Sequence, residues 1–248
     1  MRNILLEIEF DGNDYFGWQY QPKRKTVQGT IEAALQKILQ EPVTLIGASR
    51  TDAGVSAQAQ FANFITNSQL SVKTIQNGLN SLLPRDIYIR NACSVHLRFN
   101  ARFDAKSKVY RYQIINGRSP LQQRFAWEVK YPLNINKMKQ AAKLFVGSHD
   151  FRPFCAIKKE QEKAGQKEGI VDIKRVDIRS LEANRMITIE IEADRFLYKM
   201  VRRIVGCLVE VGRGKRTKND IKLALAGKPH PPFLVAPAKG LTLLMVKY

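Results

Sequence analysis

The order in which strand and helix periodicities follow one another restricts the possible folds of this chain more than any other feature. Apolar residues that alternate with polar ones predict strands, and apolar residues three and four positions apart predict helices. The first half contains a strand, a helix, two strands, a helix and a strand, at residues 2–10, 26–39, 42–47, 61–66, 71–83 and 86–97. This order predicts a split β-α-β unit in which two helices pack on one sheet.

The second half follows a similar order. It contains a strand, a helix, two strands, two helices and a closing strand, at residues 106–115, 134–146, 171–181, 186–193, 196–211, 218–226 and 241–248. We therefore predict an α+β protein of two ferredoxin-like (split β-α-β) subdomains. Residues 98–106 form the expected boundary, with an N-terminal subdomain at 1–104 and a C-terminal subdomain at 105–248.

One segment of the second half has no structural periodicity. Residues 158–169, KKEQEKAGQKEG, contain no large apolar side chain. They predict a solvated, mobile loop. Such a loop could close over a nucleic acid, and a plain surface insertion is an equally good interpretation.

The charge of the chain is high and unevenly distributed. The formal net charge is +19. Residues 1–105 hold 11 Lys and Arg against 9 Asp and Glu, an excess of 2, whereas residues 106–248 hold 30 against 13, an excess of 17. A general need for solubility would not require this asymmetry. A polyanionic partner, most simply a nucleic acid, is therefore expected to bind mainly through the second half.

Several other classes of protein are disfavoured by the sequence. No apolar run is long enough to span a bilayer, and Glu7 and Glu9 interrupt the apolar N-terminus in a way that a secretion signal would not tolerate. We expect a cytoplasmic protein without a membrane partner. The segment VGRGKRT lacks the features of a phosphate-binding loop. No nucleotide cofactor is therefore implied.

Metal and disulfide chemistry are also not indicated. The three cysteines and three histidines are far apart in the sequence, at positions 93, 155 and 207 and at positions 96, 149 and 230. This spacing fits neither a paired metal knuckle nor a disulfide framework. We expect reduced cysteines and no metal.

The most suggestive short stretch is GASRTDAGVSA, residues 47–57, which follows a short apolar run. Glycines permit close approach of backbones, and a guanidinium such as that of Arg50 favours the ionised form of a nearby carboxylate. An ionised Asp52 could act as a nucleophile or general base. Alternatively, Asp52 could simply form an Asx-type turn, and this stretch alone favours the turn.

Two further patterns could contribute to nucleic-acid binding. On a strand, Lys106, Lys108, Tyr110 and Tyr112 share one face, which would place cations beside rings that could stack on bases. Tyrosines on strands are equally often ordinary core residues.

At helical spacing, the predicted helix 196–211 and its flank cluster four cations on one side: Arg195, Lys199, Arg202 and Arg203. Such a stripe is often only a solvated face. In this basic half of the chain we expect it to contact phosphate, with Arg202 at its edge able to reach inward.

Taken together, these stretches resemble the tRNA pseudouridine synthase A family over nearly the whole chain. The similarity is carried by five ordered blocks: FDGNDYFGWQYQP with TVQGTIEAAL, then GASRTDAGVSA, ARFDAKSKVYRY, RFLYKMVRRIVGCLVEVGRGK and APAKGLTLLMVKY. The resemblance implies the pseudouridine synthase fold, in which two subdomains share one mainly antiparallel sheet, and a homodimer.

The resemblance also implies a reaction and a set of site residues. The reaction would be isomerisation of uridine to pseudouridine at positions 38, 39 and 40 of the tRNA anticodon stem-loop, with base flipping and without metal or organic cofactor. By similarity Asp52 is the nucleophile, Tyr110 packs on the target base, Arg202 pairs with the aspartate and Arg50 helps to displace the flipped base. A non-catalytic RNA-binding protein of paired ferredoxin-like modules is the alternative.

Four residues depart from the usual pattern of that family. Ser49 stands where glycine is common, Ser56 and Asn100 where histidine is common, and Arg203 where asparagine often follows the arginine. None of these departures removes a reacting group. They bear on the range of targets and on the contacts with RNA.

Overall fold

The computed structural model describes residues 1–156, 169–181 and 185–248 and divides the chain into two compact units. Unit 1 comprises Met1–Lys106 and Thr242–Tyr248, and unit 2 comprises Ser107–Leu241. The first junction lies two residues from the predicted boundary. The closing strand, which the sequence analysis assigned to the C-terminal subdomain, belongs to unit 1 from Thr242 onward. The reason is a pairing in which Thr242 lies beside Ser56 in a parallel ladder.

Unit 1 has the predicted β-α-β-β-α-β order and a mainly antiparallel sheet. Its elements are β1 (Arg2–Phe10), α1 (Val27–Leu39), β2 (Ile46–Gly47), β3 (Ser56–Thr66), α2 (Val72–Leu82), β4 (Ile87–Val95) and β10 (Leu241–Lys247). The strands follow the order β4-β1-β3, with β2 and β10 both on β3. The β1–β3, β1–β4 and β2–β3 pairs are antiparallel. This is the ferredoxin-like arrangement that the sequence predicted.

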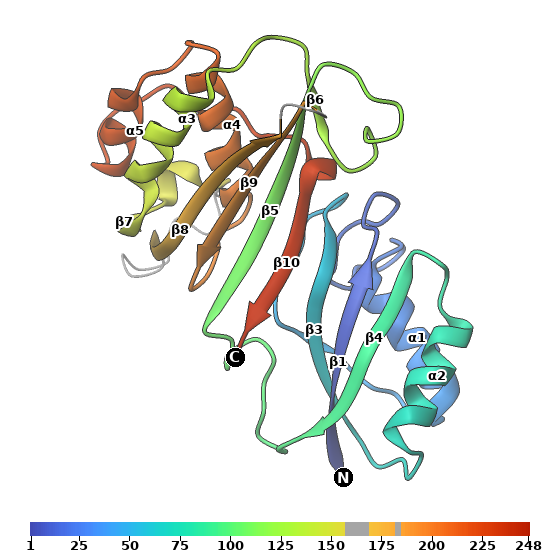
Figure 1. Ribbon diagram of the computed structural model, residues 1–248. Coiled ribbons are helices and arrows are strands. Elements are labelled where there is room, and N and C mark those ends of the chain that lie inside the picture. Colours follow the sequence, from blue (N-terminus) through green and yellow to red (C-terminus); the bar gives the residue numbers. More distant parts are fainter. Residues whose placement is uncertain (157–168, 182–184) are drawn as a thin grey trace. The chain divides into compact units, whose positions relative to one another are not determined.

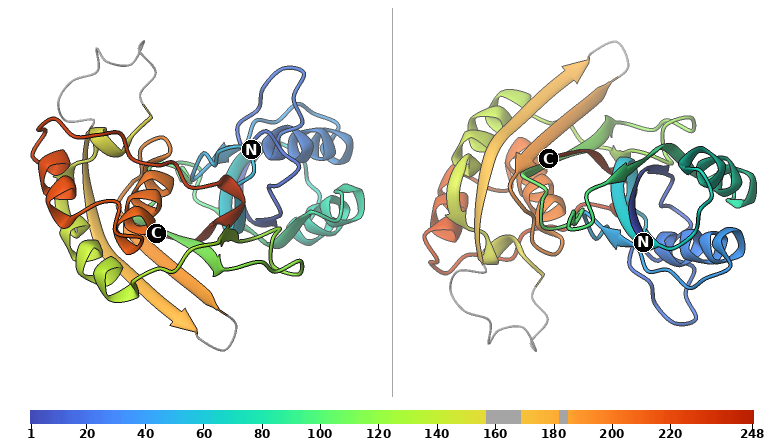
Figure 2. Two further views of the ribbon diagram at one scale, coloured as in Figure 1. Left: turned by 90° about the horizontal axis from the view of Figure 1, so that it is seen from above. Right: turned by 90° about the horizontal axis from the view of Figure 1, so that it is seen from below.

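Both helices of unit 1 lie on the same face of the sheet (Figure 1), as the views in Figure 2 also show. Each begins at a side-chain cap: Thr26 accepts the backbone N–H of Gly29, and Ser71 that of Thr74. The residues that form the core of this unit include Ile4, Leu6, Ile8, Ile31, Leu35, Phe64, Ile75 and Leu79, all at most 1% exposed.

The predicted strand at 42–47 is wrong for most of its length, because only Ile46–Gly47 pairs with β3. Side chains of α1 occupy the backbone groups that a longer strand would need. The backbone N–H of Leu45 donates to the Glu32 carboxylate at 2.8 Å, and the Gln28 amide donates to the Leu45 carbonyl at 3.3 Å. The residue just before β2, Leu45, is therefore hydrogen-bonded to side chains of α1 and not to a neighbouring strand.

Unit 2 carries a second mainly antiparallel sheet. Its elements are β5 (Ser107–Asn116), β6 (Trp127–Val129), α3 (Ile135–Ala142), β7 (Gly147–Asp150), β8 (Ile170–Leu181), β9 (Met186–Ala193), α4 (Met200–Gly212) and α5 (Lys218–Leu225). The strands follow the order β5-β9-β8-β7, and β6 adds to β5 in parallel. Figure 1 shows the three helices gathered in one group, in which α3 contacts both α4 and β8. The α+β class with mainly antiparallel sheet is thus confirmed.

Several predictions for unit 2 need correction. The short strands β6 and β7 were not predicted, and the helix predicted at 134–146 ends at Ala142 and continues as one 3-10 turn, Lys143–Phe145. The predicted mobile loop at 158–169 lies outside the described residues except for Gly169. That glycine is buried, and its carbonyl accepts the Phe151 N–H at 2.9 Å, so it is not part of a solvated loop. Among the described residues, no helix is long and apolar enough to cross a membrane.

Candidate active site

Asp52 lies in the loop that leads from β2 to β3, and its side chain is half-buried. The turn around it is closed by the backbone, since the N–H of Val55 donates to the Asp52 carbonyl at 3.2 Å. Gly54 occupies this turn with a φ of +78°, a conformation that favours glycine. The turn thus has a backbone hydrogen bond of its own, and an Asx-type role for the Asp52 side chain stays an alternative.

A second segment of unit 1, residues 12–18, lies directly against the Asp52 loop. The N–H of Trp18 donates to the Thr51 carbonyl at 3.1 Å, and the N–H of Gly54 donates to the Tyr15 carbonyl at 3.2 Å. At the other end, the N–H of Gly12 donates to the Ser56 hydroxyl at 3.0 Å. The Asp52 loop is therefore held along its length by a segment 33 to 44 residues earlier in the chain.

Glycines in both segments, among them Gly17 and Gly47, make this close approach possible. A Cβ atom on Gly17, where φ is +87°, would lie 2.5 Å from the Thr51 carbonyl oxygen and 3.1 Å from the carbonyl carbon of Asp52. A Cβ atom on Gly47 would overlap the indole ring of Trp18, which is 1% exposed. Each segment thus has a glycine where the other packs against it. The glycines around Asp52 predicted a close backbone approach at this loop, but no pattern in the sequence identified residues 12–18 as the partner.

Gln60 of β3 holds the start of the Asp52 loop by two hydrogen bonds to the backbone of Ser49. Its side chain is fully buried, its amide donates to the Ser49 carbonyl at 2.6 Å, and its carbonyl oxygen accepts the Ser49 N–H at 3.3 Å. These contacts use the backbone of Ser49, so they do not depend on the departure from glycine at this position. Ser56, by contrast, uses its own hydroxyl to hold Gly12.

The other predicted residue of unit 1, Arg50, is exposed on the same loop as Asp52. The remaining two predicted residues, Tyr110 and Arg202, lie in unit 2. The proximity of Asp52 to Arg202 and Tyr110 therefore stays a prediction.

Tyr110 is a buried residue of β5, with 5% of its surface exposed and its ring edge-on to Phe196 at 5.0 Å between centroids. Its neighbour on the same strand face, Tyr112, is fully buried and donates its hydroxyl to the Pro237 carbonyl at 2.7 Å. Burial raises the pKa of the Tyr112 phenol, and the charge of Arg202 opposes this shift. Burial of both rings favours the alternative that Tyr110 and Tyr112 are core residues of β5, and the packing of Tyr110 on the target base stays a prediction.

Arg202 lies on α4 and is bound by two hydrogen bonds to Ala236, in the irregular segment before β10. Its Nε donates to the Ala236 carbonyl at 2.8 Å, and its own carbonyl accepts the Ala236 N–H at 3.0 Å. The guanidinium is half-buried. Because Nε is already bonded, the orientation of the guanidinium plane is set by the backbone at residue 236.

The predicted cationic stripe on one helix is wrong. The helix begins at Met200, and Lys199 before it has a left-handed φ of +58°. Arg195, outside the helix, donates its Nη2 to the Ile170 carbonyl at 2.7 Å, and Arg203 donates to the Cys155 carbonyl at 2.9 Å. Of the four cations only Arg202 and Arg203 therefore lie on the helix, and contact of these residues with phosphate stays a prediction.

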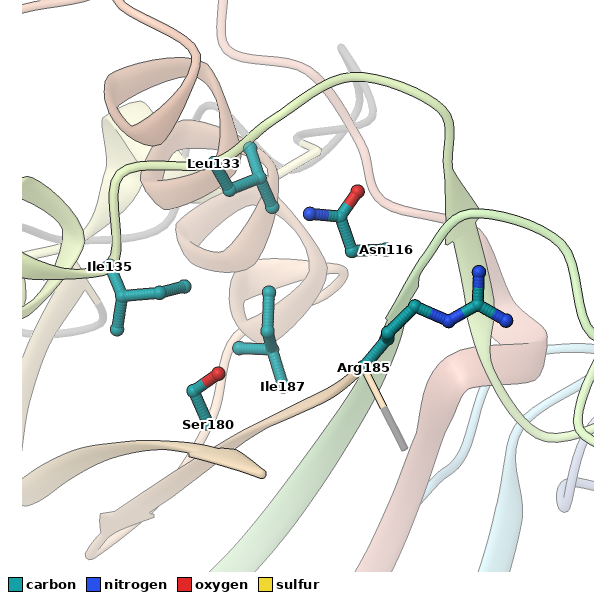
Figure 3. Close-up of a pocket in the computed structure, with 6 residues that line it drawn as sticks. All are labelled: Asn116, Leu133, Ile135, Ser180, Arg185 and Ile187. Carbon is teal, nitrogen blue, oxygen red and sulfur yellow. The ribbon is translucent and has the colours of Figure 1, made fainter. Parts of the chain in front are cut away.

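Unit 2 also contains a pocket of about 220 Å³, shown in Figure 3 and lined by Asn116, Leu133, Ile135, Ser180, Arg185 and Ile187. The Arg185 side chain extends away from Leu133 and Ile135. None of the four predicted site residues, all of which are described, lines this pocket. Within residues 1–156, 169–181 and 185–248, no group of three or more His, Cys, Asp or Glu side chains could hold a metal ion.

Comparison with known proteins gives one consistent result. Residues 7–104 and 141–248 match the family model described as tRNA pseudouridine synthase. The chain is 42% identical over 252 residues to a tRNA pseudouridine synthase A of Thermoanaerobacter sp. (strain X514), and 42% identical over 258 residues to that of Caldicellulosiruptor bescii. It is also 42% identical over 252 residues to a tRNA pseudouridine synthase A 2 of Clostridium perfringens. Each alignment covers 100% of both chains.

Proposed function

The chain belongs to the tRNA pseudouridine synthase family, and from this premise we propose that it isomerises uridine to pseudouridine at positions 38, 39 and 40 of the tRNA anticodon stem-loop. An enzyme of this family is an isomerase that acts on uridine in tRNA. The positions, the nucleophile and the flipping of the base are the parts that we add. The positions and the flipping of the base rest on the family resemblance, and the assignment of Asp52 is supported by its placement in a loop whose backbone is held on both sides.

The reaction breaks the bond between N1 of uracil and C1′ of ribose and forms a bond between C5 and C1′. C5 loses its proton and N1 gains one, so that no atom or electron enters or leaves overall. A carboxylate can serve in two ways: it can add to the base, or it can assist at the sugar carbon as the glycosidic bond breaks. Both routes require that the carboxylate stay in one place while the base turns. The interlocked backbone around Asp52 supports this role.

The uridine must also leave its stack before it can react. Extruding a base costs about a few kcal/mol, which a pocket with an aromatic wall and fixed charges can offset. We assign the wall to Tyr110, whose ring is held edge-on by Phe196, and the fixed charge to Arg202, whose Nε is bonded to Ala236. Arg50, exposed beside Asp52, would then assist the displaced base.

The assembly and compartment are further proposals that rest on the family resemblance. We infer a homodimer in the cytoplasm that binds tRNA through basic surfaces, in keeping with a formal net charge of +19. Light scattering of the purified protein, alone and with tRNA, measures the number of subunits. A monomer in both conditions would contradict the dimer.

The test of the function uses a tRNA transcript and no added cofactor. We expect the wild-type protein to form pseudouridine at positions 38–40, and Asp52→Asn to reduce the rate by on the order of 10⁴-fold or more while tRNA binding stays within a few-fold. A matched control is Asp177→Asn, which also removes a carboxylate beside an arginine, Arg175, at 2.5 Å, but outside the proposed site.

Two results would contradict this assignment. A wild-type protein that binds the transcript tightly but forms no pseudouridine would favour the non-catalytic RNA-binding alternative. An Asp52→Asn variant as active as Asp177→Asn would leave the reaction intact and remove Asp52 from it.

A further inference from the structure

The surface loop at residues 16–25, which we call the basic–aromatic loop, exposes rings and cations together. Phe16 is 47% exposed and Tyr20 is 55% exposed. The consecutive side chains of Lys23, Arg24 and Lys25 are exposed as well. Rings among cations are a common way to stack bases while phosphates are neutralised.

The ring of Phe16 and the guanidinium of Arg24 form one unit of this surface. The central carbon of the Arg24 guanidinium lies 4.5 Å from the centroid of the Phe16 ring. Lys25 is engaged differently, since its Nζ lies 4.3 Å from the ring of Tyr15 and 3.7 Å from the Asp86 carboxylate. Phe16 and Arg24 are therefore the pair that presents a ring and a planar cation at the surface.

The backbone beneath Phe16 is held in place. Its N–H donates to the Lys25 carbonyl at 2.9 Å, and its carbonyl accepts the side-chain amide of Gln21 at 3.0 Å. The next residue, Gly17, accepts the N–H of Val27 at 3.2 Å. A ring on such a backbone loses little further conformational freedom when it binds.

Phe16 also lies between the two points at which its segment is attached to the Asp52 loop. The preceding residue, Tyr15, accepts the N–H of Gly54, and the following residue, Gly17, packs against the carbonyl carbon of Asp52. All of these residues belong to unit 1. A base that stacks on Phe16 would thus lie next to the loop that carries the Asp52 carboxylate.

We infer that Phe16 and Arg24 bind an unstacked nucleotide of the substrate RNA, adjacent to the uridine that reacts. Phe16 would stack on the base, and Arg24 would contact its phosphate or extend the stack. The inference rests on the proposed function for the identity of the RNA, and it adds a stacking surface for a neighbouring nucleotide to the wall that we assign to Tyr110. It makes Phe16 and Arg24 binding residues, distinct from those that carry out the reaction.

The experiment measures the dissociation constant of a tRNA transcript at several salt concentrations for variants at both positions. Phe16→Leu keeps an apolar side chain but removes the ring, and we expect binding to weaken by about 5- to 150-fold. Phe16→Trp keeps a stacking surface and should restore binding to within about three-fold. Arg24→Ala should lower the slope of log Kd against log salt by roughly one unit.

Matched controls come from the same unit. Tyr88→Leu removes another exposed ring, 53% exposed on β4, and Lys73→Ala removes another exposed cation, on α2. Both should bind RNA like the wild type. The inference is overturned if Phe16→Leu binds as Tyr88→Leu does, or if Phe16→Trp and Phe16→Leu are equally weak. Weaker binding by Phe16→Leu than by the controls supports the inference. A wild type that forms no pseudouridine refutes the proposed function, whatever the ratios of the dissociation constants.

Discussion

Replacing Gly17 with alanine should damage the reaction more than the fold, because Gly17 supports the loop that carries Asp52. The backbone of Gly17 has a φ of +87°, which costs an alanine roughly 1–2 kcal/mol. The new Cβ would also lie 2.5 Å from the Thr51 carbonyl oxygen, too close for any real contact. Relieving that overlap requires a movement of roughly half an ångström, at a cost of about 1–3 kcal/mol if the site stays packed.

The total destabilisation is therefore about 2–5 kcal/mol when the loop does not yield, and nearer the lower value when it does. For a chain of this size each kcal/mol lowers Tm by about 2–4 °C. If the Asp52 loop yields, its carboxylate moves with it, and a misplacement of about 1 Å can cost on the order of 10²-fold in rate. We expect Gly17→Ala to lose about 10- to 100-fold in kcat, with KM for tRNA within about three-fold.

Gly214→Ala separates backbone strain from the overlap. Gly214 has a similar φ of +81°, but a Cβ there would meet no atom within 4 Å. This variant should lose roughly 1–2 kcal/mol of stability and no activity per folded molecule. Thermal melts and single-turnover pseudouridine formation, measured on both variants below their melting temperatures, make the comparison. If Gly17→Ala turns over as fast as Gly214→Ala, the interlocked segments do not position Asp52.

Two further predictions concern unit 2. Tyr112→Phe leaves the half-buried Pro237 carbonyl without its donor, and should lower the free energy of unfolding in urea by about 1–3 kcal/mol; an unchanged midpoint would mean that water replaces the hydroxyl. Thr217 and Asp220 form a capping box at the start of α5, in which the backbone N–H of Thr217 lowers the pKa of the Asp220 carboxyl below its ordinary 3.8. The capping box therefore adds stability above the unfolded-state pKa of Asp220 and loses it as the pH falls through the folded-state pKa. The difference in Tm between the wild type and Asp220→Asn should therefore shrink below about pH 4 and stay constant from pH 5 to 7.

Local patterns in the sequence were sufficient for the elements whose apolar residues face a core. The alternation in residues 2–10 and the helical spacing in 71–83 predicted β1 and α2 within one or two residues, since burial of one face is what each pattern records. The same patterns failed where side chains compete for backbone groups. Glu32 and Gln28 bind the backbone at Leu45, so that a predicted six-residue strand shrinks to two residues.

The start of helix α4 was also predicted wrongly from periodicity. Periodicity extended the predicted helix back to residue 196, but the Asp194 carboxylate accepts the N–H of Arg195 at 2.7 Å and Lys199 turns left-handed, so the helix begins at Met200. Periodicity describes which side chains are apolar and carries no information about which backbone groups are already bonded. For this reason the four cations that the spacing placed on one helix do not all lie on it.

By itself, the sequence determined the fold class, the basic character of the chain and the loop in which Asp52 lies, because composition, spacing and short motifs are properties of neighbouring residues. Only the tertiary structure decided that Tyr112 is a core residue, that residues 12–18 hold the Asp52 loop, and that an exposed ring at Phe16 lies beside it. These are contacts between residues tens of positions apart. They depend on how two loops pack, which no periodicity along the chain records.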